Sequence, residues 1–103
     1  MVRHRIYMTA ALGKFRDAIK YWEDLNTLRA HKGWARATLW SPIMGDFNQI
    51  VAEYEYPHMA AFTKETEAFQ SDSEAMDLFR KGPELAAGSW PRDEILEEAP
   101  HIA

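Results

Sequence analysis

The segment 34–56 restricts the fold more than any other part of the chain, because apolar and polar side chains alternate on both sides of a short turn. Runs 34–40 and 47–56 both show the period of two that places every second side chain on the same face of a strand. Loop 41–46 contains one proline and one glycine, which favour chain reversal. The segment therefore predicts two antiparallel strands joined by a hairpin.

The N-terminal part supplies a strand and a helix to this hairpin. Residues 2–9 alternate in the same way and predict a first strand. Residues 13–32 carry apolar side chains every three or four positions, which predicts an amphipathic helix. Arg29 lies in its expected last turn, where a cation favours the negative helix end, and Gly33 suits the position just beyond.

The C-terminal part predicts a second helical region and a last strand. Pro57 suits the first turn of a helix, and residues 71–74 match a capping box for a further helical piece. Residues 92–97 are expected to form a short edge strand, with Ile95 as its clearest inward residue, and 99–103 a tail.

The element order is therefore strand, helix, strand, strand, helix, strand. Right-handed crossovers turn this order into an α+β, ferredoxin-like βαββαβ fold with a four-stranded antiparallel sheet. The expected strand order is four, one, three, two, with both helices on one face. A length of 103 residues fits a single domain, 1–103.

Two helices leave the second sheet face open. The apolar strand faces, including His4 with Ile6 and Met8, are expected to meet the helices. The open face then mixes aromatic and charged side chains: Arg3, Arg5, Tyr7, Arg36, Thr38, Trp40, Gln49, Val51 and Glu53. Exposed apolar groups in such a setting mark an interface, so we expect a homodimer through the open sheet face. Its charges need partners or water, which predicts a polar cavity between the copies.

Composition narrows the function classes. A net charge of −4 disfavours nucleic-acid binding, and no apolar run approaches the roughly 20 residues of a membrane span. The absence of cysteine agrees with a reducing compartment, and the start of the chain lacks a signal-peptide pattern, so we expect a cytoplasmic protein. No histidine pair has a ligand spacing, and no phosphate- or dinucleotide-binding motif occurs. We therefore expect no metal and no cofactor.

The candidate ligand-binding residues are those of the open face. They are Arg3, Arg5, Tyr7, Arg36, Trp40 and Glu53. Guanidinium groups suit a carboxylate or an enolate, but they equally suit an ion-pair network that sets dimer register. The aromatic side chains either wall a pocket or anchor the interface.

The candidate catalytic residues are His4, Tyr7 and Arg36. An imidazole with a pKa near 6.5 suits proton transfer, although a strand histidine held near the sheet edge is the favoured explanation of His4. Glu65 and Glu67 are expected on a solvated helix face.

Several stretches together resemble the dimeric α/β-barrel superfamily, and more closely its NIPSNAP-like branch. They are the first strand with its Arg and His, Gly13 before the long helix, His31–Trp34 after it, Leu39–Gly45 in the hairpin and Glu53–Tyr56 before the next helix. The resemblance implies a homodimer whose sheets enclose an interior cleft. The wider superfamily includes cofactor-independent monooxygenases, haem-degrading enzymes and polyketide cyclases. His4 lies roughly where stress-responsive A/B barrel proteins carry a histidine.

Three functions follow from these patterns. The first is a dimer that binds a small anionic or aromatic molecule, either between sheet and helices or within the barrel. The second is a cofactor-independent monooxygenase- or isomerase-like enzyme acting on an aromatic or polyketide-like substrate. The third is a purely structural dimer module.

Overall fold

The computed structural model describes residues 1–88 and 92–100. Its elements are β1 (Val2–Thr9), α1 (Phe15–Lys32), β2 (Thr38–Trp40), β3 (Gln49–Tyr56), α2 (Met59–Ser71), α3 (Ser73–Phe79), the 3₁₀ helix η1 (Gly82–Leu85) and β4 (Arg92–Glu97). The strands form one antiparallel sheet in the order β2-β3-β1-β4. The predicted ferredoxin-like α+β fold and strand order are confirmed. The end of the predicted tail, 101–103, lies outside the described residues.

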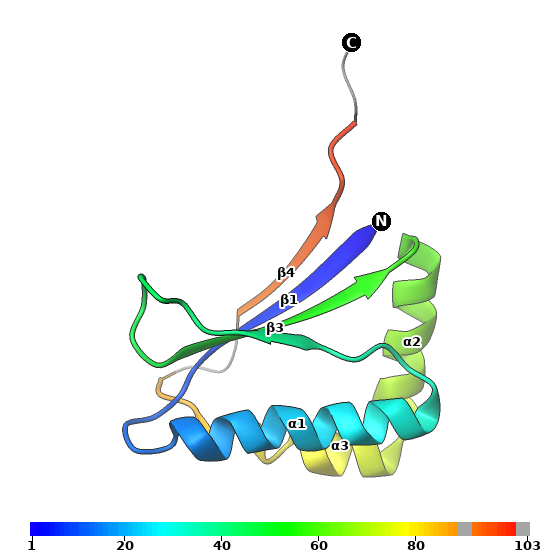
Figure 1. Cartoon of the computed structure of the whole chain (residues 1–103). Coiled ribbons are helices and arrows are strands. Elements are labelled where there is room, and N and C mark those ends of the chain that lie inside the picture. Colours follow the sequence, from blue (N-terminus) through cyan, green and yellow to red (C-terminus); the bar gives the residue numbers. More distant parts are fainter. Residues whose placement is uncertain (89–91, 101–103) are drawn as a thin grey trace.

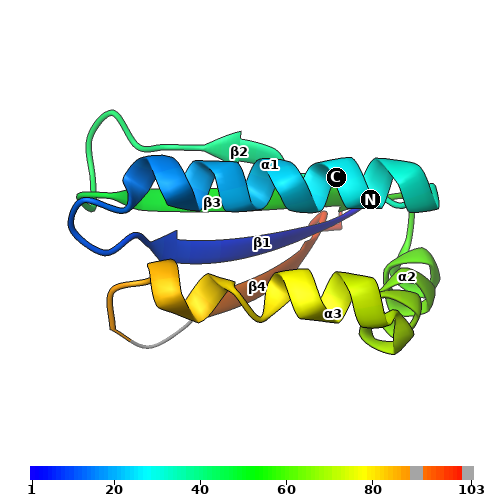
Figure 2. The ribbon, with the colours of Figure 1, turned by 90° about the horizontal axis from the view of Figure 1, so that it is seen from below.

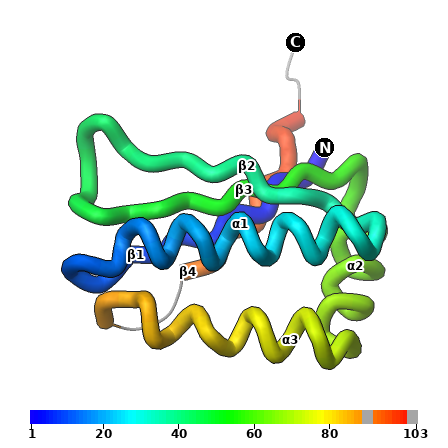
Figure 3. The backbone as a smooth tube through the Cα atoms, turned by 60° about the horizontal axis from the view of Figure 1, so that its bottom comes forward, coloured from blue at the N-terminus to red at the C-terminus, as the bar shows by residue number. Residues whose placement is uncertain are grey.

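All three α-helices leave the same sheet face free. Figure 1 shows α1 and α3 beneath the sheet, with α2 standing at one end of it. Seen from below, α1 and α3 run side by side, roughly along the direction of β1 and β3 (Figure 2), and the backbone tube shows the same layers (Figure 3). The prediction of helices on a single face is confirmed.

The core lies between the sheet and these helices. Ile6, Met8, Ile50 and Tyr54 are each at most 5% exposed, which confirms the predicted inward face of β1 and β3. Trp22 of α1 is 1% exposed, and its indole N–H donates to the Met8 sulfur at 3.3 Å. Burying each such large apolar side chain contributes about 1.5–3 kcal/mol.

The register of β1 against β3 places opposite charges side by side on the open face. Arg5 pairs with Glu53 across the ladder, and Arg3 pairs with Glu55. Cross-strand pairs of opposite charge favour this register over a slip of one residue, which would also expose the apolar faces.

Strand β2 is shorter than the predicted strand 34–40. The backbone N–H of Ala35 donates to Glu65 Oε1 at 2.8 Å, and that of Ala37 donates to Asn26 Oδ1 at 2.7 Å. Because side chains of α1 and α2 take these donors, the chain joins β3 only from Thr38 onward.

The helix starts differ by one or two residues from the prediction. His58 has an extended backbone, and its Nδ1 accepts from the Ala61 N–H at 3.1 Å, so α2 begins after it and Pro57 lies outside the helix. Asp72 caps α3 through Oδ1, which accepts from the Ala75 N–H at 2.9 Å. The predicted capping box therefore started one residue too early.

The prediction is right for the end of α1 and only partly right for the inward residue of the last strand. Gly33 does end α1, with a left-handed φ of 75°. Ile95 pairs with His4 and so shares its face, but its side chain stays 46% exposed because β4 is an edge strand.

Candidate functional site

A cavity of about 220 Å³ lies between the sheet and the helices. We call it the sheet–helix cleft. Its lining is Ile6, Leu25, Phe69, Met76 and Phe79 as apolar walls, with His4, Arg29, Tyr54, Thr66, Gln70 and Asp93 as polar groups. An apolar pocket with a few converging polar groups is the usual form of a small-molecule site.

Arg29 brings a positive charge into this apolar setting. It lies in the last turn of α1 and is only 7% exposed. Its guanidinium group lies over the rings of Tyr54, at 4.2 Å, and Phe69, at 4.8 Å. Nη1 donates to Glu65 Oε2 at 3.1 Å and to the Ala35 carbonyl at 3.2 Å. Burial of a charge requires such pairing, because an unpaired ion would cost several kcal/mol.

One donor of this cluster is unused. Glu65 also accepts from the Tyr56 hydroxyl, so its carboxylate is fully engaged. Arg29 Nε, by contrast, is buried and has no hydrogen-bond partner among the described residues. A buried donor without an acceptor costs about 1–3 kcal/mol, and the cation–π contacts of the guanidinium group with Tyr54 and Phe69 offset part of that cost.

His4 faces the same cleft from β1. Its ring stacks on Tyr54 at 5.8 Å and meets the edge of Phe62 at 5.2 Å. Nε2 lies 3.6 Å from Asp93 Oδ2. Burial lowers the pKa of His4, and the charge of Arg29 lowers it further, while Asp93 acts in the opposite direction. The imidazole is therefore neutral at pH 7 and can accept or donate a hydrogen bond.

The sequence placed His4 correctly on the helix face but missed its buried neighbours. Arg29 was expected at the helix end, without a buried partner, and the expectation that Glu65 is solvated is wrong, since its side chain is 15% exposed. A signal was present. Glu65 lies three residues after Phe62 and four before Phe69, so it shares the apolar face of α2.

Five of the six predicted ligand-binding residues come together on the open face. They line a shallow depression of about 300 Å³ together with Val51: Arg3, Arg5, Tyr7, Trp40 and Glu53. The depression is formed by β1, β2 and β3, as the alternation of each strand requires.

Ion pairs and hydrogen bonds already connect most of these groups. Arg5 Nε donates to Glu53 Oε2 at 2.7 Å, which raises the pKa of the Arg5 guanidinium. The Tyr7 hydroxyl donates to Glu94 Oε1 at 3.0 Å, and Arg3 lies 3.2 Å from Glu55. Of the two explanations for these residues, an anion-binding site or an ion-pair network, the observed ion pairs and hydrogen bonds favour the network. Glu94 was not among the predicted residues, because the register of β4 against β1 is not readable from local alternation.

Arg36 lies apart from both groups. It lines a different surface depression, next to Asn26, Ala30 and His31 of α1. The expectation that it shares a site with Arg5 and Tyr7 is wrong in position, because the segment before β2 follows α1 instead of pairing with β3.

Two negative findings hold for residues 1–88 and 92–100. No group of three or more His, Asp or Glu side chains there could hold a metal ion. No helix in the same ranges has the length and apolar character of a membrane span.

Comparison with solved structures shows where this fold occurs. An uncharacterised NIPSNAP domain protein from Burkholderia xenovorans matches with a TM-score of 0.78 and 16% identity, covering 100% of this chain and 99% of that one. A NIPSNAP family protein from Agrobacterium tumefaciens matches with a TM-score of 0.74 and 11% identity, covering 95% and 92%. A Deinococcus radiodurans protein provisionally named an antibiotic biosynthesis monooxygenase matches with a TM-score of 0.71 and 7% identity, covering 100% and 97%.

At these identities the matches establish the fold. The resemblance predicted from the sequence, a ferredoxin-like fold of the NIPSNAP-like type, is confirmed at that level. No protein-family model matches the chain, and no curated protein matches it.

Proposed function

We propose that the protein binds a small anionic or aromatic molecule in the sheet–helix cleft. The observation that carries this proposal is an apolar-walled cavity lined by both a buried cation, Arg29, and a neutral imidazole, His4.

The cleft also suggests what the ligand looks like. A volume of about 220 Å³ suits a molecule of roughly one ring with short substituents. Met76 and Phe79 are partly exposed and offer apolar surface to such a ring, and the positive charge of Arg29 attracts a carboxylate or another anionic substituent. Neutral His4 supplies a second polar contact for a hydroxyl group.

We further propose that a second copy covers the open sheet face. Trp40 is 55% exposed there, and it adjoins the paired charges of Arg5 and Glu53. A face-to-face packing of two sheets buries such a surface, and a specific interface needs about 1,200–2,000 Å² in total. Dimerisation and a cytoplasmic location remain predictions from the sequence.

Thermal denaturation with a panel of small aromatic carboxylates tests the binding proposal. A ligand at 100 times its Kd adds about 2.7 kcal/mol of stability and raises the Tm. His4→Gln should reduce that rise, because it alters one of the cleft's polar contacts. Arg36→Ala is the matched control, since Arg36 lies outside the cleft, and its Tm rise should equal that of the wild type. No Tm rise with any panel member would count against the proposal.

The second candidate function is a cofactor-independent oxygenase or isomerase. It is favoured by a neutral imidazole in an apolar-walled cleft, where His4 would remove a proton from an acidic carbon and the charge of Arg29 would stabilise the resulting enolate. The fold is also that of a protein named as a monooxygenase. Deuterium exchange into a bound carbonyl probe, with oxygen uptake monitored, separates this function from binding alone. A structural dimer module would show neither exchange nor a Tm rise.

A further inference from the structure

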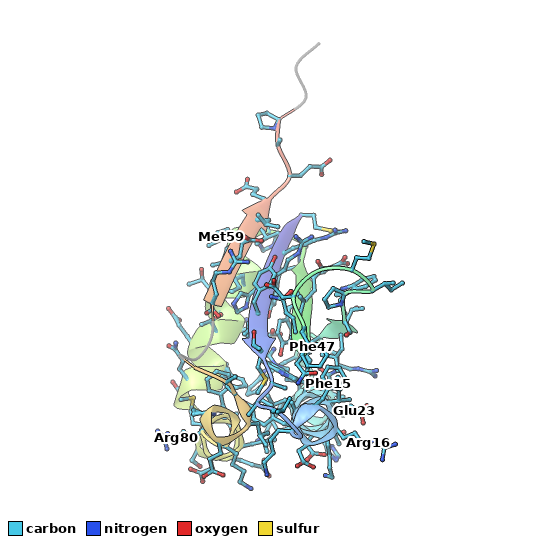
Figure 4. All side chains as sticks on the ribbon, turned by 90° about the vertical axis from the view of Figure 1, so that its left-hand side faces the viewer. Phe15, Arg16, Glu23, Phe47, Met59 and Arg80 are labelled. Carbon is cyan, nitrogen blue, oxygen red and sulfur yellow. The ribbon has the colours of Figure 1, made fainter. Side chains whose placement is uncertain are left out.

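The loop between β2 and β3 carries a cluster of exposed apolar side chains that has no role in the proposed function. We call residues 41–48 the hairpin arm. Ile43 is 102% exposed, Met44 91% and Phe47 77%. Figure 1 shows the arm extending from one end of the sheet, and Figure 4 shows Phe47 on the sheet side of α1. Single exposed apolar residues are common, but three within five residues mark a contact surface.

The arm is shaped by its own backbone. Asn48 and Gly45 have positive φ angles, of 58° and 136°. A side chain at Gly45 would meet Pro42 at 3.3 Å, so the turn is closed to most other residues. The Ala10 N–H donates to the Asn48 carbonyl at 2.9 Å and fixes the base of the arm to the end of β1. The base of the arm is therefore held in place, which lowers the entropy cost of docking.

A receptive surface lies at the other end of the sheet. A depression of about 380 Å³, which we call the terminal depression, is lined by Met1, Arg3, Arg5, Leu96, Glu97 and Glu98. Met1 is 56% exposed and Leu96 37%. In Figure 1 the arm lies at the left, while the N-terminus and the end of β4 lie to the right, and both regions rise from the sheet on the side away from α1.

Resting on the open-face dimer proposed above, we propose that the hairpin arm of each copy docks into the terminal depression of the other. When two twisted sheets pack with crossed strands, they come closest at two diagonally opposite corners. In a two-fold symmetric dimer these two corners are equivalent, so the contact between arm and depression occurs twice. Ile43 and Met44 then cover Met1 and Leu96. The one charged residue of the arm, Asp46, approaches Arg3, whose side chain is 45% exposed.

The absence of cysteine from the chain permits a direct test. Two single variants, Met44→Cys and Leu96→Cys, are prepared, mixed in equal amounts and oxidised in dilute solution. The expected result is a disulfide-linked dimer in the mixture, with little linked dimer in either variant alone. Met44→Cys mixed with Arg80→Cys is the control, because Arg80 is an exposed residue of the helix layer and should not be linked.

The mass of the wild-type protein separates the two proposals. A particle of 11.9 kDa at working concentration overturns both the dimer and the docking. A dimer whose mixed cysteine variants stay unlinked overturns the docking alone. Efficient linking of Met44→Cys to itself also overturns it, because the two arms would then lie against each other. Ile43→Asp, which places a charge in the docked surface, should raise the dimer dissociation constant at least about tenfold.

Discussion

Replacing Glu65 by glutamine tests the buried cluster on which the cleft depends. The substitution keeps the shape of the side chain but removes the charge opposite Arg29, whose side chain is 9% exposed. It also weakens the hydrogen bonds from the Tyr56 hydroxyl and the Ala35 N–H. The guanidinium group would then remain buried without its counter-ion.

The expected cost is large for a protein of this size. Removing one partner of a buried ion pair costs about 3–5 kcal/mol, and a domain has only about 5–15 kcal/mol of stability in total. Because the glutamine amide keeps one acceptor oxygen, we expect the lower end, about 3 kcal/mol. At a urea slope of about 2 kcal/mol per molar, the unfolding midpoint would fall by about 1.5 M.

Urea unfolding followed by circular dichroism measures this change. Glu67→Gln is the matched control, because Glu67 is exposed on the same helix and its replacement should stay within about 0.5 kcal/mol of the wild type. A double variant, Arg29→Met with Glu65→Gln, should lose less than the sum of the two single losses. The reasoning is refuted when Glu65→Gln is as stable as Glu67→Gln.

Three further substitutions test single features. His4→Gln should flatten the pH dependence of stability between about pH 7 and 5. The pKa of His4 in the folded wild type lies below the ordinary 6.5, so as the pH falls through 6.5 the unfolded chain takes up a proton that the folded chain does not, and the wild type loses stability. A series of urea midpoints at different pH values would detect the difference. Gly33→Ala should cost about 1 kcal/mol in the same assay, because φ is 75° although no atom lies within 4 Å of the added carbon; a neutral result would show that the helix end relaxes. Asp72→Ala should cost about 1 kcal/mol through loss of the α3 cap. The hydrogen bond from the Ala75 N–H is the main reason that the pKa of the Asp72 carboxylate is lowered. The difference between wild type and variant should therefore shrink at low pH, where this carboxylate takes up a proton. Equal wild-type and Asp72→Ala midpoints at pH 7 would contradict the capping assignment.

The sheet faces were predictable because they depend on local alternation. In β1 and β3 the residues at alternate positions are buried, apart from the half-buried His4, and the period of two is visible without any knowledge of partners. Strand β2 was predicted too long because the donors of Ala35 and Ala37 are taken by Glu65 and Asn26. Those partners are distant in sequence, so no local pattern predicts them.

The candidate site likewise has one part that local sequence patterns predict and one part that they do not. The open-face group follows from the alternation of neighbouring strands and was largely predicted. The cleft depends on Arg29 meeting Glu65, 36 positions away, and on Asp93 reaching His4 from the edge strand. The first contact arises only when the two helices dock and the second only when β4 pairs with β1, since each residue taken alone fits a charged helix or strand surface.

The most direct test of the binding proposal is an NMR titration of the ¹⁵N-labelled protein with a small aromatic carboxylate. We predict shifts that saturate and that cluster at the amides of His4, Arg29, Tyr54 and Asp93, around the sheet–helix cleft. Shifts confined to Arg5 and its open-face neighbours, or no saturable shift with any member of the probe panel, would contradict the account.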